Sequence, residues 1–275
     1  MLQNRFHHWV TTLSAVAVIA LVAVLNAGAV EVRWDASTGL LPSEACPPWT
    51  HGGDWQPDPP SGGVLTLVTG ECGQNNWYRQ RPIVVPDSLR VEFQARLTRV
   101  GTCSSCGIFR SCLAVAITVA PATGTILWVA HGRIFLTTVF GCTSSVEVPL
   151  NTAEFHVYSI LVVGDVVTVA VDGIPMLEAQ TYTDMEEHGP EPRIVWGDFS
   201  IFAYGQSEWT YFRHNAHPTG CGACCVADIC HEMTPQQCID AGGEYQGTGT
   251  SCEPNPCHQT PTKATTWGRI RAGYR

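Results

Sequence analysis

The sequence predicts an all-β protein: a two-sheet antiparallel sandwich followed by a small disulfide-rich module. Short apolar runs separated by turn residues fill the stretch 32–217, with hardly any helical periodicity. Seven of the 13 cysteines fall between Cys221 and Cys257, where large aliphatic residues nearly vanish. Because no helical crossovers lie between the apolar runs, a wound α/β fold is excluded. We divide the chain into a signal peptide at 1–29, a sandwich at 30–218, a cysteine-rich module at 219–258 and a polar, basic tail at 259–275.

Alternating and continuous apolar runs identify the strands. The segments 63–69 and 89–97 alternate apolar and polar residues, as a strand does when one face is wet. The segments 113–120 and 125–130 are apolar on both faces, as expected where a second layer covers the sheet. Further strands are expected at 155–163, 166–171, 174–177, 193–197 and 207–213. Tight hairpin turns are expected at Gly164-Asp165 and Asp172-Gly173. The total is about eleven or twelve strands, which favours a sandwich of two sheets.

Composition sets limits on the partners and on the compartment. Apolar residues make up 45% of the 275 residues and charged residues only 14%, so a buried core is feasible. The balance of 15 basic against 24 acidic residues gives a net charge of −9, which excludes a nucleic acid as partner. Thirteen cysteines with 26 glycines and 18 prolines are typical of a protein that folds in oxidising surroundings.

The N-terminus has the features of a secretory signal peptide. Arg5 precedes the apolar run 10–25, and Ala27-Gly28-Ala29 supplies the small residues that a signal peptidase reads, so we expect cleavage after Ala29. The alternative is an uncleaved membrane anchor, which needs about 20 apolar residues. No other segment is long and apolar enough to span a bilayer. The mature protein is therefore expected in the secreted, periplasmic or cell-surface space, without a stable membrane span.

The cysteine-rich module is expected to depend on covalent links, because it has too few large apolar residues to form a core. One short helix is expected there, with Thr234 as N-cap, Pro235 in the first turn, Gln237 completing a capping box, and an end at Gly242-Gly243. The adjacent Cys224 and Cys225 are expected to take different partners, because a bridge between neighbours is strained.

We expect structural disulfides rather than metal sites. Cys103-x-x-Cys106 and Cys221-x-x-Cys224 have the spacing of zinc ligands, but an exported chain meets an oxidant. The odd total leaves one thiol that is free or bonded to another molecule, unless the argument for export and oxidation is incomplete, and Cys221, outside the six-cysteine block that starts at Gly222, is the candidate. The expected disulfide cysteines are Cys46, Cys72, Cys103, Cys106, Cys112, Cys142, Cys224, Cys225, Cys230, Cys238, Cys252 and Cys257.

Several short motifs resemble secreted bacterial members of the concanavalin A-like lectin/glucanase (laminin G-like) superfamily. They are Trp34-Asp35, Leu41-Pro42, Pro48-Trp49, Glu92-Phe93-Gln94-Ala95-Arg96, Phe155-His156-Val157-Tyr158, Val171-Asp172-Gly173, Ile194-Val195-Trp196-Gly197-Asp198 and Ser207-Glu208-Trp209-Thr210-Tyr211. The resemblance covers about 180 residues and implies a jelly-roll sandwich. It implies no activity, because that superfamily contains lectins, glycosidases, adhesion modules and spacers.

The C-terminal region carries a second resemblance. Gly222-Ala223-Cys224-Cys225, Cys230, Thr234, Cys238, Gly242-Gly243, Tyr245, Gly247, Gly249, Cys252 and Cys257 resemble a small GACC-type module found near the C-termini of secreted bacterial proteins. The ending Trp267-Gly268-Arg269-Ile270 with Tyr274-Arg275 is similar to a terminal signature of exported proteins, a sorting or attachment tag. Neither resemblance implies a reaction.

The sequence favours a protein that is not an enzyme. Glycosidases of this fold carry carboxylates on alternate residues of one strand, as Glu-x-Asp-x-x-Glu or Glu-x-Asp-x-Glu, and no such run exists here. The nearest acids, Asp184 and Glu186, lie in an expected loop. They are read as a solvated acidic loop, as a calcium site completed by Asp198, or as an atypical catalytic pair. No Gly-x-Ser-x-Gly motif is present. A histidine in an apolar strand, such as His156, is expected to be structural.

If the protein is not an enzyme, a binding protein is the remaining interpretation, and aromatic residues in loops are the candidate ligand contacts. Sugar-binding sandwiches stack exposed aromatic rings on pyranose rings and orient hydroxyls with neighbouring polar groups. The candidate ligand-binding residues are Trp77, Tyr78, Arg79, Tyr182 and Asp184, with Trp49 and Trp55 as further aromatics near the start. Packing is the competing interpretation for any such ring, and the residues expected in the core are Trp128, Trp196, Trp209 and Phe212.

Three functions of different classes follow from the sequence. The first is a non-catalytic carbohydrate-binding or adhesion module of the bacterial cell envelope or its surroundings, with a glycan as partner and no cofactor except, in one interpretation, calcium. The alternative is a glucanase-type glycoside hydrolase with an unusual acid pair, or a structural envelope spacer. Convergence of the loop aromatics and the acidic loop on one concave surface would favour the first.

Overall fold

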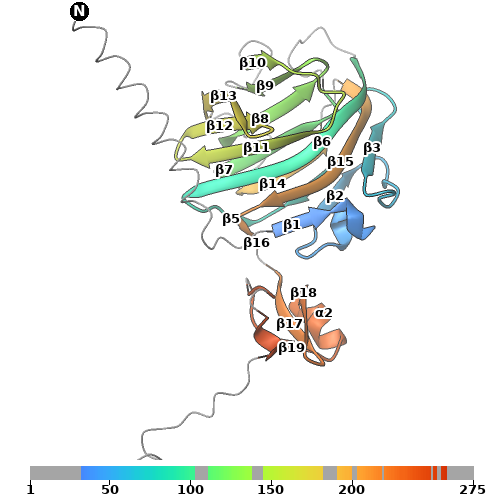
Figure 1. Cartoon of the computed structure of the whole chain (residues 1–275), viewed down its shortest axis with the longest axis vertical. Helices are drawn as coiled ribbons and strands as arrows, with labels where there is room; N and C mark the ends of the chain where they lie inside the picture. Colours follow the sequence, from blue (N-terminus) through green and yellow to red (C-terminus); the bar gives the residue numbers. More distant parts are fainter. Residues whose placement is uncertain are drawn as a thin grey trace, which may run out of the picture. The chain divides into compact units, whose positions relative to one another are not determined.

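The protein is an all-β, two-sheet antiparallel jelly-roll sandwich with a small disulfide-rich C-terminal module (Figure 1). The computed structural model describes residues 32–102, 111–137, 145–181, 191–199, 203–218, 220–248, 250–252 and 255–258. The predicted signal peptide at 1–29 and tail at 259–275 lie outside these residues. Within these ranges, none of the helices has the length and apolar character needed to cross a bilayer.

Seven strands form the first sheet, in the order β1-β15-β6-β11-β12-β13, with β3 pairing to β15 on the same edge as β1. Their bounds are β1 Val32–Asp35, β3 Leu65–Thr69, β6 Ser88–Thr102, β11 His156–Val163, β12 Val166–Val171, β13 Ile174–Gln180 and β15 Ala203–His214. In β6 the residues from Leu89 to Leu97 alternate buried and half-buried, which confirms the predicted strand with one wet face. Figure 1 shows β6, β11 and β15 crossing this sheet side by side.

Seven further strands form the second sheet, in the order β10-β9-β8-β7-β14-β4-β2. Their bounds are β2 Thr50–Gly53, β4 Asn76–Gln80, β7 Ala114–Ala120, β8 Thr123–Ala130, β9 Arg133–Thr137, β10 Ser145–Pro149 and β14 Arg193–Asp198. Both faces of β7 and β8 are largely buried, as predicted from their continuous apolar runs. A short pair, β5 (Ile83–Val84) with β16 (His217–Pro218), lies outside the two sheets. The chain passes repeatedly from one sheet to the other, since β1, β3 and β6 alternate with β2 and β4.

Aromatic side chains fill the space between the sheets around Trp196 on β14. Five rings have centroids between 4.7 and 5.8 Å from the Trp196 ring: Trp34, Trp49, Tyr78, Trp209 and Phe212. All are fully or almost fully buried. Large rings contribute most to the stabilisation of a core, because each removes about 150–250 Å² from water. The predicted burial of Trp196, Trp209 and Phe212 is confirmed, and Trp128 is buried as well, in a second apolar cluster.

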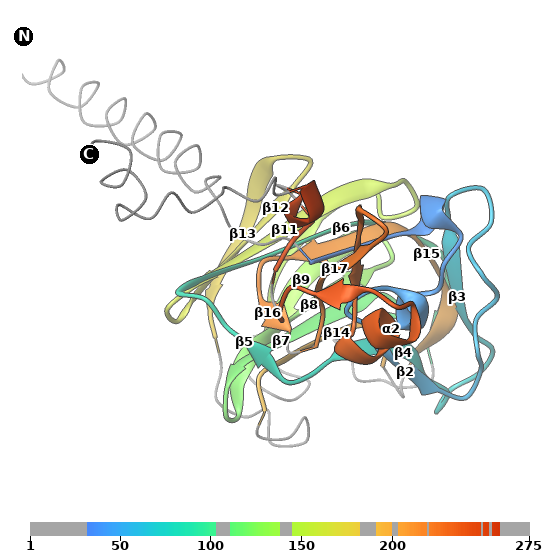
Figure 2. The same cartoon turned by 90° about the horizontal axis from the view of Figure 1, so that it is seen from below.

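The cysteine-rich module consists of three short strands and one helix. The strand β17 (Gly222–Val226) pairs with β18 (Ile229–Met233) and β19 (Glu244–Tyr245), and α2 (Pro235–Asp240) packs against β17 and β19 (Figure 1). Figure 2 shows β17 and α2 from below. The predicted capping box is present: Gln237 N donates to Thr234 Oγ1 at 3.2 Å and Thr234 N donates to Gln237 Oε1 at 2.9 Å. Gly242, just after the helix, has a positive φ of 68°, which glycine adopts without strain.

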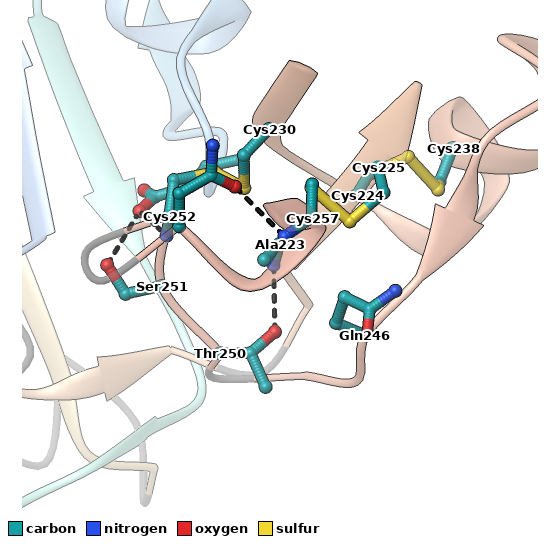
Figure 3. The surroundings of a disulfide bond; sticks show 12 residues. Ala223, Cys224, Cys225, Cys230, Cys238, Gln246, Thr250, Ser251, Cys252 and Cys257 are labelled. Carbon is teal, nitrogen blue, oxygen red and sulfur yellow. Dashed lines mark hydrogen bonds between the residues drawn. A yellow bond between two sulfur atoms is a disulfide. The ribbon is translucent and has the colours of Figure 1, made fainter. Parts of the chain in front are cut away.

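Three disulfides connect the elements of the module (Figure 3). They are Cys224–Cys238, Cys225–Cys257 and Cys230–Cys252. The adjacent Cys224 and Cys225 therefore take different partners, as predicted. Cys224 joins β17 to α2, while Cys225 joins β17 to the short 3-10 helix Pro256–His258. The third bridge joins β18 to the segment after β19, so disulfides connect both β17 and β18 to other parts of the module.

The assignment of the free cysteine is corrected by the structure. Cys221 is bonded to Cys46, 175 residues earlier in the chain, so it is not the free thiol. Cys112, expected in a disulfide, is the free cysteine of the described part of the chain. It is buried at the start of β7, where its thiol donates to the backbone oxygen of Arg99 at 3.3 Å and its sulfur lies against the backbone at Gly205. Cys72 is disulfide-bonded, whereas Cys103, Cys106 and Cys142 lie outside the described residues.

Candidate functional site

A groove of about 750 Å³ lies along the outer face of β3. Strand alternation builds its floor: Leu65 and Leu67 point into the sandwich, so Thr66 and Val68 point outward. Val68 is 40% exposed although it is apolar. The residues that line the groove are Trp55, Gln56, Pro57, Asp58, Pro59, Ser61, Val64, Thr66, Val68, Gly70, Glu71, Gln74 and Asn76.

The segment that follows β2 forms one wall of the groove, and its indole is the most prominent feature. Trp55 is 57% exposed, unlike the tryptophans of the core. Asp54 fixes the start of this segment: its N–H donates to Asn75 O at 3.0 Å, and its carboxylate accepts from Asn75 N at 2.8 Å. Pro57 and Pro59 restrict the backbone that follows. The wall is therefore held in place without a ligand.

The turn 70–75 also lines the groove and is equally constrained. The side-chain oxygen of Gln74 accepts from the N–H groups of Gly70 at 2.8 Å and Glu71 at 3.2 Å. Cys72, within the turn, is disulfide-bonded. Asn76 connects the groove to the second sheet, because its side-chain nitrogen donates to Val68 O at 3.3 Å and its side-chain oxygen accepts from His51 Nε2 at 3.1 Å. The groove is preorganised by hydrogen bonds on both sides.

The groove combines a largely apolar lining with polar groups and negative charge. Of its lining residues, Asp58 and Glu71 are acids and none is a lysine, arginine or histidine. Three amide side chains, Gln56, Gln74 and Asn76, and two hydroxyl side chains, Ser61 and Thr66, complete the polar part. An exposed indole surrounded by amides, hydroxyls and carboxylates has the donors and acceptors that orient hydroxyl groups of a ligand.

The candidate contacts Trp77, Tyr78 and Arg79 do not form an exposed stacking platform. Tyr78 is wrong as a ligand contact: it faces the core, is fully buried, and burial raises the pKa of its hydroxyl. Trp77 and Arg79 are half-buried on the opposite face of β4, with the guanidinium carbon 5.0 Å from the indole centroid. The indole also lies against Gly52, where a Cβ would come within 2.2 Å of it. Burial, and then the charge of Arg81, lower the pKa of Arg79. A ligand role for Trp77 and Arg79 stays a prediction.

The acidic-loop predictions divide between described and undescribed residues. Tyr182, Asp184 and Glu186 lie outside the described residues. Asp198, the third candidate calcium ligand, is 2% exposed and accepts the hydroxyl of Thr69 inside the sandwich. Among the residues that the structure describes, no group of three or more His, Cys, Asp or Glu side chains is placed to hold a metal ion. A calcium site on this loop stays a prediction.

The outer face of the second sheet has no carboxylate on its described central strands. The strands β4, β7, β8 and β9 contain no Asp or Glu, and the one acid of β14, Asp198, points into the sandwich. The face is instead apolar and buried, with the residues Ala114, Ala116, Ile126, Trp128, Ala130, Phe135 and Val195. Retaining or inverting hydrolysis of a glycoside requires two carboxyl groups about 5 to 9.5 Å apart across a cleft. These strands supply no such pair.

Two other polar clusters have structural roles. His156 Nδ1 lies 2.7 Å from Asp172 Oδ2 and its Nε2 lies 3.0 Å from Asn151 O, which confirms the structural role predicted for it. Partial burial acts to raise the pKa of Asp172, but the hydrogen bonds from His156 and Val157 N outweigh it and lower the pKa. On the outer face of the first sheet, Glu92 accepts from Tyr211 Oη at 2.8 Å and from Arg213 Nε at 2.9 Å. The side chains of both clusters are thus hydrogen-bonded to other groups of the protein.

From the sequence, Trp49 and Trp55 were equal candidates as further aromatic contacts, and the structure buries Trp49. The signal that separates the two was present in the sequence. Trp55 is followed by Gln56-Pro57-Asp58-Pro59-Pro60, a run in which regular strand pairing cannot continue. Trp49 instead directly precedes β2, and its ring reaches Trp196 in the core.

Comparison with known proteins finds structural likeness and no sequence family. No family model matches the chain, and no curated protein matches it. The laminarinase from Flavobacterium sp. UMI-01 aligns at 14% identity with a TM-score of 0.46, over 68% of this chain and 100% of that one. A Bacillus licheniformis β-glucanase aligns at 12% identity with a TM-score of 0.41, over 69% of this chain and 99% of that one. A sialidase aligns at 12% identity with a TM-score of 0.46 over 68% of this chain, which spans 18% of the sialidase. At these values the fold assignment rests on the strand order itself.

Proposed function

We propose that this protein is an exported, non-catalytic carbohydrate-binding protein of the concanavalin A-like type, and that the groove along β3 is its glycan site. One observation carries the proposal: Trp55 is 57% exposed at the wall of a preorganised groove of about 750 Å³. An exposed indole costs free energy in water, and in the groove it offers a flat apolar face beside amides and hydroxyls. A pyranose ring presents the complementary surface, an apolar C–H face bordered by hydroxyl groups.

Export is part of the proposal. Four disulfides between described cysteines, added to the signal-peptide pattern at 1–29, support folding in an oxidising compartment. A location that is secreted, periplasmic or at the bacterial cell surface would bring the groove into contact with envelope or environmental glycans. The proposed divisions at 30–218 and 219–258 would then separate the glycan-binding sandwich from the covalently linked module.

The absence of catalysis is supported by the distribution of acids in the described strands. The two acids of the groove, Asp58 and Glu71, lie along an exposed sheet edge, and the buried face of the second sheet has none on its central strands. We expect no release of reducing sugars from β-glucans. Release that survives Asp58→Asn and Glu71→Gln but depends on Asp184 or Glu186 would instead support the glucanase alternative.

The direct test measures glycan binding by the mature protein. A panel of soluble oligosaccharides is titrated by calorimetry, with and without calcium, against the wild type, Trp55→Phe and Trp55→Ala. We expect Trp55→Ala to weaken binding about tenfold, because an aromatic contact contributes about 1 kcal/mol beyond its buried area, and Trp55→Phe to weaken it less. Ile174→Ala, which removes an exposed side chain of β13, is the matched control and should bind as the wild type does. Equal binding by Trp55→Ala, or no binding across the panel, would overturn the proposal.

A further inference from the structure

The charges of the groove restrict which glycan fits it. Among the described residues that line it are Asp58 and Glu71 and no basic side chain. Asp58 has no hydrogen-bond or ion-pair partner among the described residues. Glu71 accepts only a long contact, 3.3 Å from Gln74 Nε2, so most of its hydrogen-bonding capacity is unused. Two carboxylates without cations create a negative potential where the ligand would lie.

That potential acts on any charged glycan that enters. Like charges brought together at an interface cost free energy, whereas opposite charges favour association and set specificity. Uronate, sulfate or phosphate groups on a sugar chain would meet Asp58 and Glu71 without a compensating arginine or lysine in the lining. The net charge of the chain, −9, opposes polyanions further. The groove therefore disfavours acidic glycans.

The combination of one indole with two carboxylates favours a cationic sugar. Trp55 offers a flat face for a pyranose ring, and an ammonium group on that ring or on its neighbour would reach a carboxylate along the same wall or in the turn 70–75. The volume of about 750 Å³ lies within the range of ~300–1,000 Å³ typical of small-molecule sites. Because the walls are fixed by the Asp54–Asn75 and Gln74 hydrogen bonds, a stiff chain of rings loses little freedom on binding.

Resting on the proposed function, we infer that the groove selects glycans with free amino groups, that is, chains containing unacetylated 2-amino-2-deoxyhexose. Trp55 stacks on a pyranose ring, while Asp58 and Glu71 accept hydrogen bonds from ammonium groups. N-acetylation removes both the charge and two of the three N–H donors of each group, so it weakens the interaction. A neutral hexose chain keeps the stacking and loses the charge contribution.

The test compares matched pentamers by calorimetry at pH 6: β-1,4-linked glucosamine, its fully N-acetylated form, the corresponding glucose chain, and a chain of glucuronate. We expect the amine pentamer to bind about tenfold more tightly than the neutral chains at about 20 mM salt, because exposed charge pairs contribute up to roughly fivefold each. The glucuronate chain should bind most weakly. At about 0.5 M salt the preference for the amine should fall to within about twofold, since exposed charges are screened.

Isosteric variants assign the preference to the two acids. Asp58→Asn together with Glu71→Gln should reduce the amine preference to about twofold and leave the affinity for the glucose chain unchanged. Asp87→Asn, which neutralises an exposed acid outside the groove, is the control and should keep the full preference. Equal binding of the amine and N-acetyl pentamers, or a preference that survives the double variant, would overturn the inference.

The outcomes separate this inference from the proposed function. If the neutral chains bind in a Trp55-dependent manner without any amine preference, the glycan-binding function stands and the inference fails. If no pentamer binds, the proposed function fails first and the inference with it. A lysine pentamer is included as a peptide competitor: if it binds more tightly than the amine pentamer and does so equally well to Trp55→Ala, the ligand is a basic peptide and the inference is wrong.

Discussion

The sandwich and the cysteine-rich module (219–258) are stabilised in opposite ways. In the sandwich, five aromatic rings surround Trp196, and the sheets bury them almost completely. In the described part of the module, the buried side chains are Cys221, Ala223, Cys224 and Cys238, and three disulfides lie within it. A segment this short cannot remove enough apolar area from water, so sulfur bridges supply what burial cannot.

Because they are stabilised differently, the sandwich and the module should lose their structure in response to different substitutions. The stability of the sandwich depends on side-chain volume, and that of the module depends on the restriction of its unfolded chain. Substitutions that remove side-chain volume should therefore lower the stability of the sandwich and leave that of the module unchanged. Removal of a disulfide from the module should lower the stability of the module and leave that of the sandwich unchanged. Four measurements, in order of decreasing effect, test this difference.

Removal of the central indole should have the largest effect. Trp196→Ala leaves a cavity among five aromatic rings, and truncation of a large buried aromatic costs about 3–5 kcal/mol of the free energy of unfolding. Guanidinium unfolding followed by near-UV circular dichroism measures the loss. The matched variant Trp55→Ala, which truncates an exposed indole, should change stability by less than about 0.5 kcal/mol. Similar losses in both variants would contradict the assignment of Trp196 to the core.

Removal of one module bridge should come next. The Cys225–Cys257 bond closes a loop with a sequence separation of 32, for which chain entropy gives about 3–4 kcal/mol. In the double variant Cys225→Ser, Cys257→Ser we expect amide hydrogen exchange in β17 and β18 to accelerate sharply. The amides of β6 and β15 should exchange as in the wild type. Equal acceleration in both regions would show that the two depend on each other.

A smaller effect is expected from the helix cap of the module. Thr234→Ala removes the acceptor of the Gln237 N–H, and the loss of such a cap costs about 1 kcal/mol. Amide exchange in α2 should become about fivefold faster. Thr234→Ser keeps the hydroxyl and should behave as the wild type, so an equal loss in both variants would indicate a packing role for the threonine methyl group instead.

The smallest effect concerns pH. The hydrogen bonds of Asp172 with His156 and Val157 lower the pKa of its carboxyl below the ordinary value of 3.8. A lowered pKa in the folded state stabilises the protein above the pKa of the unfolded chain, and this contribution is lost as pH falls through the folded pKa. Asp172→Asn should therefore be less stable than the wild type near neutral pH, by less than about 1 kcal/mol because the pair is exposed, and equal to it in strong acid. A difference that grows on acidification would contradict this sign.

Local patterns made much of the fold predictable. The alternation of 89–97, the two hairpin turns and the Thr234 capping box each depend on residues close together in the chain, and each is present. The resemblance to concanavalin A-like proteins added the jelly-roll arrangement, which the strand order bears out.

Long-range contacts were not predictable from local patterns. The Cys46–Cys221 bond joins residues separated by 175 positions, and cysteine spacing carries no information at that range.

The strand β4 was not predicted, for another reason. Its core-facing residues include Asn76 and Gln80, which read as a polar loop. Both are satisfied internally: Asn76 contacts His51, and Gln80 contacts His214 at 2.7 Å. Because two polar side chains share the core-facing side of β4 with Tyr78, the strand lacks the apolar and polar alternation by which the others were identified. Tyr78 lies inside the sandwich and Trp77 on the opposite face.

The candidate site, too, was predictable only in its local features. The sequence indicated that aromatics near polar residues were candidates, but only the fold separates an indole on a wall, Trp55, from one against a glycine, Trp77. The negative character of the groove also needed the fold, because Asp58 and Glu71 belong to different loops that β3 brings together.

The unpaired sulfur of Cys112 has a consequence for the disulfides, because its thiol is buried. An available thiolate attacks existing bridges and scrambles them, and a chain with many cysteines offers it many targets. Once β7 is in place, burial and then the charge of Asp198 raise the pKa of this thiol well above its ordinary value, so it no longer takes part in exchange. The folded sandwich thus keeps this thiol, the unpaired one among the described cysteines, from reacting with the disulfides of the chain.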